Sequence, residues 1–117
     1  MTCDCDSSKS YETCCGPFHA GENPPSPQAL MRARYTAYAR GRFDYVLSTW
    51  HASTRPHGVG ADDEKWVRLE VKRASEEGDT GIVEFVAISK ENGRAQRMHE
   101  VSSFVREGGR WFYFGPQ

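Results

Sequence analysis

After residue 15 the sequence contains no further cysteine, so it lacks the dispersed disulfides that hold small secreted domains together. It also lacks any apolar run near the ~20 residues of a membrane-spanning helix, which excludes a helical membrane protein. The first residues have neither the basic nor the apolar region of a signal peptide. We therefore expect a cytoplasmic protein with reduced cysteines and no membrane contact.

The sequence also has no large excess of basic over acidic residues, or of acidic over basic residues. Fifteen Lys and Arg residues stand against 16 Asp and Glu residues, giving a formal net charge of -1. Binding to nucleic acid mainly through electrostatics is thereby disfavoured. Arg32, Arg40 and Arg42 form a basic helix face, but such faces usually contact only solvent. We expect no nucleic-acid partner.

Several catalytic signatures are absent as well. There is no Gly-x-Ser-x-Gly nucleophile elbow and no glycine-rich loop of the Walker or dinucleotide-binding type. Apolar residues make up 38% of the 117-residue chain and charged residues 26%, which is ordinary for one globular domain.

The four cysteines that are present form one cluster: Cys3, Cys5, Cys14 and Cys15. Adjacent cysteines rarely form a disulfide with each other, because the small ring strains the peptide between them. Four thiolates on a tight loop suit tetrahedral zinc, which then needs no other ligand. We predict a structural zinc site, because four protein ligands leave no open position for catalysis.

Two alternatives to the four-cysteine zinc site stay open. The thiols could form a redox pair or switch. His19 lies near enough in sequence to replace one cysteine as a zinc ligand, which would leave Cys14 or Cys15 free.

Two helices followed by four strands are predicted for the rest of the chain. Ser26 is a good N-cap with Pro27 behind it, so the first helix spans 27–40 and stops at Gly41. A second helix starts at Asp44. Alternating residues predict strands at 66–74, 80–89, 95–106 and 110–114, joined by short turns as an antiparallel meander. This order indicates an α+β roll with the helices on one face of the sheet.

Glycine and proline mark the remaining segments as loops. Residues 17–27 are predicted as a linker between a knuckle (residues 1–22) and the main domain (residues 23–117). A second loop spans 51–63, and at its end Asp62 or Asp63 is predicted to cap a single turn that includes Trp66.

Particular motifs resemble known families. The pattern Cys-x-Cys-x8-Cys-Cys-Gly at 3–16 resembles the SEC-C zinc motif, which also occurs at the end of the SecA translocase. Residues 30–35, 45–51, 83–87 and 99–113 resemble the YchJ family of small bacterial proteins. The resemblance covers nearly the whole chain. It implies a nuclear transport factor 2-like fold, a cone-shaped roll of two to three helices on a four-stranded antiparallel sheet. It also implies a zinc knuckle that contacts a protein, but carries no established activity.

Arg34 is the least expected residue of the first helix, because it lies in the middle of the apolar face. A buried guanidinium needs a carboxylate partner or a route to water. Glu84 and Glu100, each within a mostly apolar strand, are the expected partners. Arg34 is then either a structural residue, paired or reaching water at the helix edge, or a clamp for an anionic ligand.

Histidines provide candidates for acid–base chemistry, since they titrate near neutral pH. The catalytic candidates are His51, His99 and Glu100. Alternation places His99 and Glu100 on opposite faces of a strand, so His51 with Glu100 is the pair to test. A hydrogen-bonded structural histidine is the alternative for each.

The predicted function is a small binding or adaptor module with a structural zinc knuckle and a cone pocket. The pocket would hold a small apolar or anionic ligand. Its candidate residues are Arg34, Tyr38, Trp50, Trp66, Glu84 and Glu100. The alternative is a small enzyme of the dehydratase, isomerase or hydrolase type. We also expect a protein partner at the knuckle and a homodimer through the open sheet face.

Overall fold

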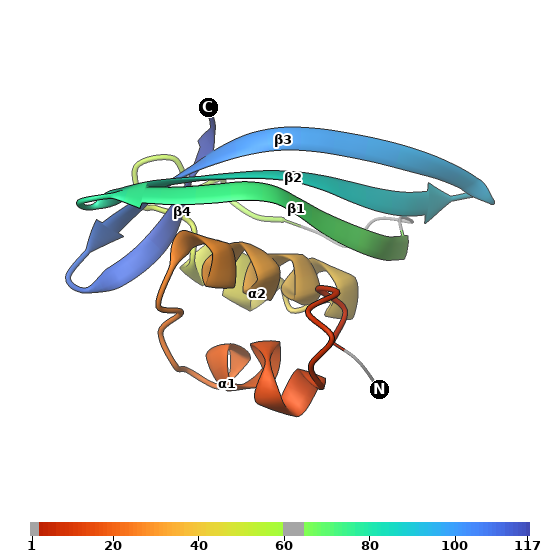
Figure 1. Ribbon diagram of the computed structural model, residues 1–117, viewed down its shortest axis with the longest axis horizontal. Helices are drawn as coiled ribbons and strands as arrows, with labels where there is room; N and C mark the ends of the chain where they lie inside the picture. Colours follow the sequence, from red (N-terminus) through yellow and green to blue (C-terminus); the bar gives the residue numbers. More distant parts are fainter. Residues whose placement is uncertain (1–2, 60–64) are drawn as a thin grey trace.

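Three α-helices and four antiparallel strands follow one another in the computed structural model, which describes residues 3–59 and 65–117 (Figure 1). The elements are a 3-10 helix η1 (Tyr11–Thr13), helices α1 (Cys15–His19), α2 (Pro27–Arg40) and α3 (Phe43–Ser48), and strands β1 (Lys65–Glu77), β2 (Thr80–Glu91), β3 (Arg94–Glu107) and β4 (Arg110–Pro116). The predicted α+β roll is confirmed.

The sheet is a meander in which each strand pairs with the next, in the order β1-β2-β3-β4. Two-residue turns join the strands. Asn92 and Gly93 both have positive φ (53° and 79°), as a type I′ hairpin turn requires. This turn sets the register of β2 against β3, which pairs Phe85 with Glu100 and Val86 with His99. Register shifts in β1 and between β3 and β4 mark β-bulges, which bend the strands.

Helix α2 begins and ends as predicted. The Ser26 hydroxyl accepts the Ala29 N–H at 3.1 Å, and Gly41 closes the helix in the left-handed conformation with φ 74°. At its start α2 approaches β2 closely. A Cβ at Gly81 would lie 2.3 Å from the Pro27 ring, so only glycine fits at that strand position.

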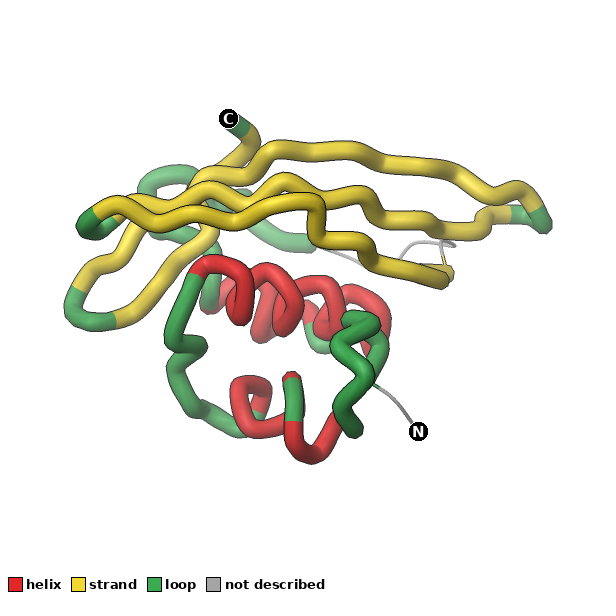
Figure 2. Tube along the Cα trace, viewed as in Figure 1, coloured by secondary structure: helices red, strands yellow, loops and turns green. Residues whose placement is uncertain are grey.

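The molecule has three layers, with α2 in the middle (Figure 2). The sheet covers one side of α2, while α1 and the N-terminal loop lie on the other. Residues on both sides of the helix are consequently buried, Leu30 and Tyr35 as well as Ala33 and Thr36. Thr36 lies on the side away from the sheet and is fully buried, because the N-terminal loop covers it there.

Three boundaries differ from the sequence predictions. Helix α3 starts at Phe43, one residue before the predicted Asp44, and ends at Ser48. Trp50 follows it and forms a β-bridge with Tyr113. The predicted linker at 17–27 contains most of α1. Pro17 is tolerated there because the first turn of a helix has unpaired N–H groups.

The segment before β1 also departs from its prediction. Trp66 belongs to β1 and not to a single turn. The predicted cap at Asp62 or Asp63 lies outside the described residues. Among the helices that the structure describes, none has the length and apolarity needed to cross a membrane.

Candidate metal centre and ligand cavity

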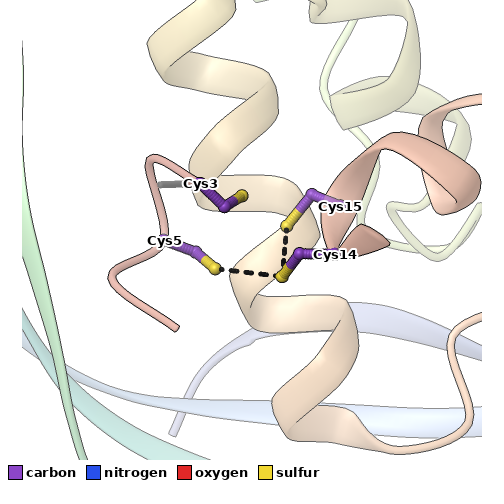
Figure 3. A group of neighbouring side chains, drawn as sticks. All are labelled: Cys3, Cys5, Cys14 and Cys15. Atoms are coloured by element: carbon purple, nitrogen blue, oxygen red, sulfur yellow. Dashed lines mark hydrogen bonds between the residues drawn. The ribbon is translucent and has the colours of Figure 1, made fainter. Parts of the chain in front are cut away.

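The four cysteines come from two short segments that face each other beside α2 (Figure 3). Cys3 and Cys5 lie on the N-terminal loop, and Cys14 and Cys15 lie at the start of α1. Asp6 and Ser8, both with positive φ, turn the chain back between the two pairs. Gly16 lets this turn close, because a Cβ there would lie 2.7 Å from the Tyr11 carbonyl oxygen.

The sulfur atoms are spaced as a tetrahedral metal site requires. All four Sγ atoms lie within 4.8 Å of one another, with 3.6 Å from Cys5 to Cys14 and 3.9 Å from Cys14 to Cys15. Zn–S bonds of ~2.3 Å place the sulfurs of a tetrahedron about 3.8 Å apart. Three of the thiols are buried and Cys14 is half-buried. The cluster therefore fits a metal ion held by four cysteines.

The pKa values of the clustered thiols also favour the binding of a cation. The Cys15 hydrogen bond lowers the pKa of Cys5 to about 4, helped by Ser7 and opposed by burial. The same hydrogen bond and burial raise the pKa of Cys15, and burial raises that of Cys14. One thiolate is thus stabilised by its neighbours. Further deprotonation in the same space needs a positive charge, which a metal supplies.

His19 does not belong to this cluster. Its Nε2 donates to the Ala33 carbonyl at 2.8 Å, and its Nδ1 accepts the Tyr11 hydroxyl at 2.8 Å. This pattern fixes the neutral ring, and burial lowers the pKa of His19. Both nitrogens are occupied, so the alternative ligand set of three cysteines and His19 does not fit this geometry.

Polar contacts attach the knuckle, residues 3–22 of the described chain, to α2 and to the sheet. Cys3 Sγ lies 3.6 Å from the Thr36 hydroxyl. Arg32 donates to the Cys5 carbonyl, and Asp6 accepts the Leu69 N–H of β1 at 2.8 Å. The interpretation of Arg32 as part of a purely solvated basic face is therefore wrong, because the knuckle covers it.

Arg40 makes a second, more exposed contact with the knuckle. Its Nε lies 3.0 Å from Asp4 Oδ2, and its guanidinium lies 3.7 Å from the Tyr11 ring centroid. Two of the three arginines of the basic face thus have partners within the chain.

On the opposite side of α2, a cavity of about 330 Å³ opens between the helix and the sheet. Its lining is mostly apolar and aromatic, with a few polar groups, as is usual for ligand sites. The residues are Met31, Arg34, Tyr35, Tyr38, Trp50, Trp66, Phe85, Ala87, Met98, Glu100, Ser102 and Tyr113. Five of the six predicted ligand-binding residues line it: Arg34, Tyr38, Trp50, Trp66 and Glu100.

Arg34 is held at the wall of this cavity and is only 5% exposed. Its Nη1 donates to the Val46 carbonyl at 2.7 Å and to the Thr49 hydroxyl at 2.8 Å. The guanidinium carbon lies 4.4 Å from the Tyr113 ring centroid and 5.0 Å from that of Trp50. Burial lowers the pKa of Arg34 to about 10, so the side chain keeps its charge at neutral pH.

Glu100 is the acidic group of the cavity. Its Oε2 accepts hydrogen bonds from the hydroxyls of Ser102 and of Tyr113, the latter at 3.0 Å. Burial and the neighbouring Glu100 charge raise the pKa of Tyr113, so its hydroxyl stays a donor. Among the described residues, Glu100 and Arg34 form no direct ion pair.

Glu84, the other expected partner of Arg34, lies on the opposite face of the sheet. There it accepts from Arg73 Nε at 2.8 Å and pairs with His99 Nε2 at 2.7 Å. Its register partner is Val101, whereas Glu100 pairs with Phe85. The expected Arg34–Glu84 pair is therefore wrong, because the two side chains lie on different sides of β2.

The predicted histidines are also outside the cavity. His51 pairs with Glu107 at 2.6 Å and with the Ser53 hydroxyl at 2.7 Å. The structure does not bring His51 and Glu100 together, because His51 is held by Glu107 at the end of β3. His99 faces away from Glu100, as alternation predicted.

Sequence reasoning missed the residues that hold the two charged groups in place. Alternation along β3 groups Ser102 with Glu100, and this signal could have identified it. Thr49, Val46 and Tyr113 approach the cavity only through tertiary packing, so no local pattern identifies them.

Comparison with known proteins gives matches along nearly the whole chain. The sequence profile of the family described as "YchJ, middle NTF2-like domain" matches residues 26–116. A UPF0225 protein of Chromobacterium violaceum is 52% identical over 109 residues, covering 86% of this chain and 81% of the relative. A UPF0225 protein of Bordetella pertussis is 44% identical, with coverage of 95% and 88%.

Two solved structures share the fold. The solution structure of a SEC-C motif containing protein from Rhodopseudomonas palustris has a TM-score of 0.90 and 36% identity, and covers 100% of this chain and 98% of its own. The crystal structure of a SEC-C motif containing protein from Psychrobacter arcticus has a TM-score of 0.85, covering 100% and 82%. At 24% identity, this second likeness supports the fold alone.

Proposed function

The chain belongs to the UPF0225 family of YchJ-like proteins. We propose that it is a small-ligand binding module held together by a structural zinc ion. The observation that carries the proposal is the set of four cysteine sulfurs within 4.8 Å of one another. Thiolates at this spacing select zinc or an iron–sulfur centre over hard cations. We choose zinc because four closely packed thiolates complete its tetrahedral shell.

The zinc would have a structural role. When bound, it supplies the positive charge that keeps the four thiolates together, and it joins the N-terminal loop to the start of α1. Cys3, Cys5, Cys14 and Cys15 would hold it. Hydrogen bonds that involve Arg32, Thr36 and Asp6 would then fix the metal-bound segment against α2 and β1.

The cavity on the other side of α2 would bind the ligand. Its volume of about 330 Å³ lies near the lower end of the ~300–1,000 Å³ of small-molecule sites. The alternative enzyme function loses support, because His51 and His99 lie outside the cavity. Glu100 is the one of the three catalytic candidates that lines it.

We extend the proposal to two protein contacts. The resemblance to the SEC-C motif supports a protein partner at the exposed part of the knuckle, which includes Lys9 and Glu12. The sheet face away from α2 has no helix over it in the described part of the chain, and Phe114 is 38% exposed. This supports a homodimer through the sheet.

Native mass spectrometry of the full, untagged chain tests the proposal. We expect one zinc ion per chain, retained until acid or a chelator removes it. Cys5→Ser should lose the metal, whereas the matched change Ser53→Ala should keep it. A metal-free chain lighter by four hydrogens would contradict the proposal and support the redox alternative. The same spectra report the subunit count.

A further inference from the structure

The cavity holds two opposite charges, and each is anchored through one atom only. Arg34 uses Nη1 for both of its described hydrogen bonds, and Glu100 uses Oε2 for both of its own. Within the described ranges, Nε and Nη2 of Arg34 have no acceptor and Oε1 of Glu100 has no donor. The cavity thus offers fixed N–H donors and a fixed carboxylate acceptor in apolar surroundings.

Tyr113 contacts both charged residues. Its ring lies 4.4 Å from the Arg34 guanidinium carbon, and its hydroxyl donates to Glu100 Oε2 at 3.0 Å. The two charges thus lie on either side of one phenol ring without forming an ion pair in the part of the chain that the structure describes. An amide group accepts a hydrogen bond through its carbonyl and donates one through its N–H, so one such group can pair with both residues.

The charge pattern argues against the simplest ligands. An anion would meet the Glu100 carboxylate, and a cation would meet the Arg34 guanidinium. A pure hydrocarbon would cover both charges without a hydrogen bond, which is costly. A neutral group with an acceptor beside a donor satisfies both residues.

The aromatic lining of the cavity indicates a flat ligand. Tyr35 and Trp66 meet edge to face at 5.9 Å between ring centroids, and Phe85 and Trp50 add further aromatic surface. Aromatic surfaces favour planar rings, and the volume admits only a small one.

We propose that the cavity binds a small, neutral, planar heterocycle through a lactam edge, whose carbonyl accepts from Arg34 and whose N–H donates to Glu100. This inference rests on the proposed ligand-binding function and specifies the ligand class. It replaces the sequence-based expectation of an apolar or anionic ligand.

Three probes of similar size test the proposal by titration against the zinc-loaded full chain. Isoquinolin-1(2H)-one carries the lactam edge, its N-methyl derivative lacks the donor, and 1-naphthoate is an anion. Binding is followed by quenching of tryptophan fluorescence, since Trp50 and Trp66 line the cavity. We expect the lactam to bind about tenfold more tightly than its N-methyl derivative, the effect of one hydrogen bond to a charged group.

The variant Glu100→Gln distinguishes the two polar probes. It removes the acceptor charge, so the lactam should bind about tenfold more weakly, while 1-naphthoate should bind more tightly. Glu84→Gln, on the outer face of the sheet, is the matched control and should change neither affinity. If Glu100→Gln fails to fold, the comparison of lactam and N-methyl lactam on the unmodified chain decides.

Two kinds of result would overturn the proposal, and they can be distinguished. Tighter binding of 1-naphthoate than of the lactam, or equal binding of the lactam and its N-methyl derivative, contradicts the ligand class and leaves a binding cavity. Failure of all three probes contradicts both the ligand class and the proposed binding function.

Discussion

The two sides of helix α2 differ in how completely their polar groups are paired. On the knuckle side, Thr36, Arg32 and the Ala33 carbonyl each have a partner in the N-terminal segment. On the cavity side, Arg34 is anchored through one nitrogen while the rest of its guanidinium borders open space. The difference agrees with the proposal that one side of the helix is held by the knuckle and the other binds a ligand.

Loss of a metal ligand should be the largest perturbation of the knuckle side. Cys5→Ser removes a thiolate at the centre of the cluster and leaves the remaining thiols without their cation. We expect the free energy of unfolding to fall by more than about 4 kcal/mol, because metal binding contributes directly to folding. Chemical denaturation with and without zinc measures this, and equal stability in both conditions would contradict it.

Arg34→Ala should be the largest perturbation of the cavity side. It removes the guanidinium donor from the Val46 carbonyl and the Thr49 hydroxyl, and it opens space between Trp50 and Tyr113. We expect a loss of about 3 kcal/mol from the unpaired groups and the cavity. The zinc content should stay at one per chain, and a simultaneous loss of zinc would show that the two sides are not separable.

Asp6→Ala tests the link between the knuckle and the sheet. The change leaves the Leu69 N–H of β1 without its acceptor. A hydrogen bond to a charged group contributes about 1.5–3 kcal/mol, and the partial exposure of this one puts the expected loss near the lower value. Thermal unfolding measures the loss, with Asp79→Ala, in an exposed turn pair, as the control.

The pH dependence of stability should reveal the neutral His19. Because burial lowers its pKa in the folded chain, the unfolded chain binds the proton more readily. The contribution of neutral His19 is therefore full above about pH 6.5 and declines as the pH falls below that value. Unfolding measured from about pH 7.5 to about pH 5.5 should show a smaller acid loss in His19→Gln than in the unmodified chain.

Any release of metal at low pH would lower the stability of the unmodified chain and of His19→Gln alike. The difference between them isolates His19, and identical acid losses would contradict a neutral, half-buried ring.

The smallest expected effect belongs to Arg40→Ala. Its pair with Asp4 and its contact with the Tyr11 ring are both partly exposed to solvent. We expect a change of about 0.5 kcal/mol, reduced further by salt. A loss as large as that of Asp6→Ala would mean that the edge of the knuckle is as tightly docked as its centre.

Sequence reasoning identified those parts of the fold that local rules determine. The Ser26 cap, the Gly41 stop and the short turns between the strands are local, and all are confirmed. The buried Arg34 followed from helical periodicity, and the cysteine cluster followed from ligand spacing. The helix ends, the turns and the cysteine spacing depend on local sequence and not on tertiary contacts.

The errors came from long-range pairing. The expected Arg34–Glu84 pair fails because the register of β2 against β3, set by the turn at Asn92 and Gly93, puts Glu84 and Glu100 on opposite faces. His51 was paired with Glu100 because nothing local indicates its contact with Glu107, which is 56 residues away. The contact between Arg32 and the Cys5 carbonyl depends on the knuckle folding back onto α2.

X-ray absorption spectroscopy at the zinc edge of the purified full chain tests the central claim most directly. The account predicts one zinc ion with four sulfur neighbours at ~2.3 Å and no nitrogen in the first shell. Three sulfurs with one nitrogen, or a chain that binds no zinc, would contradict it.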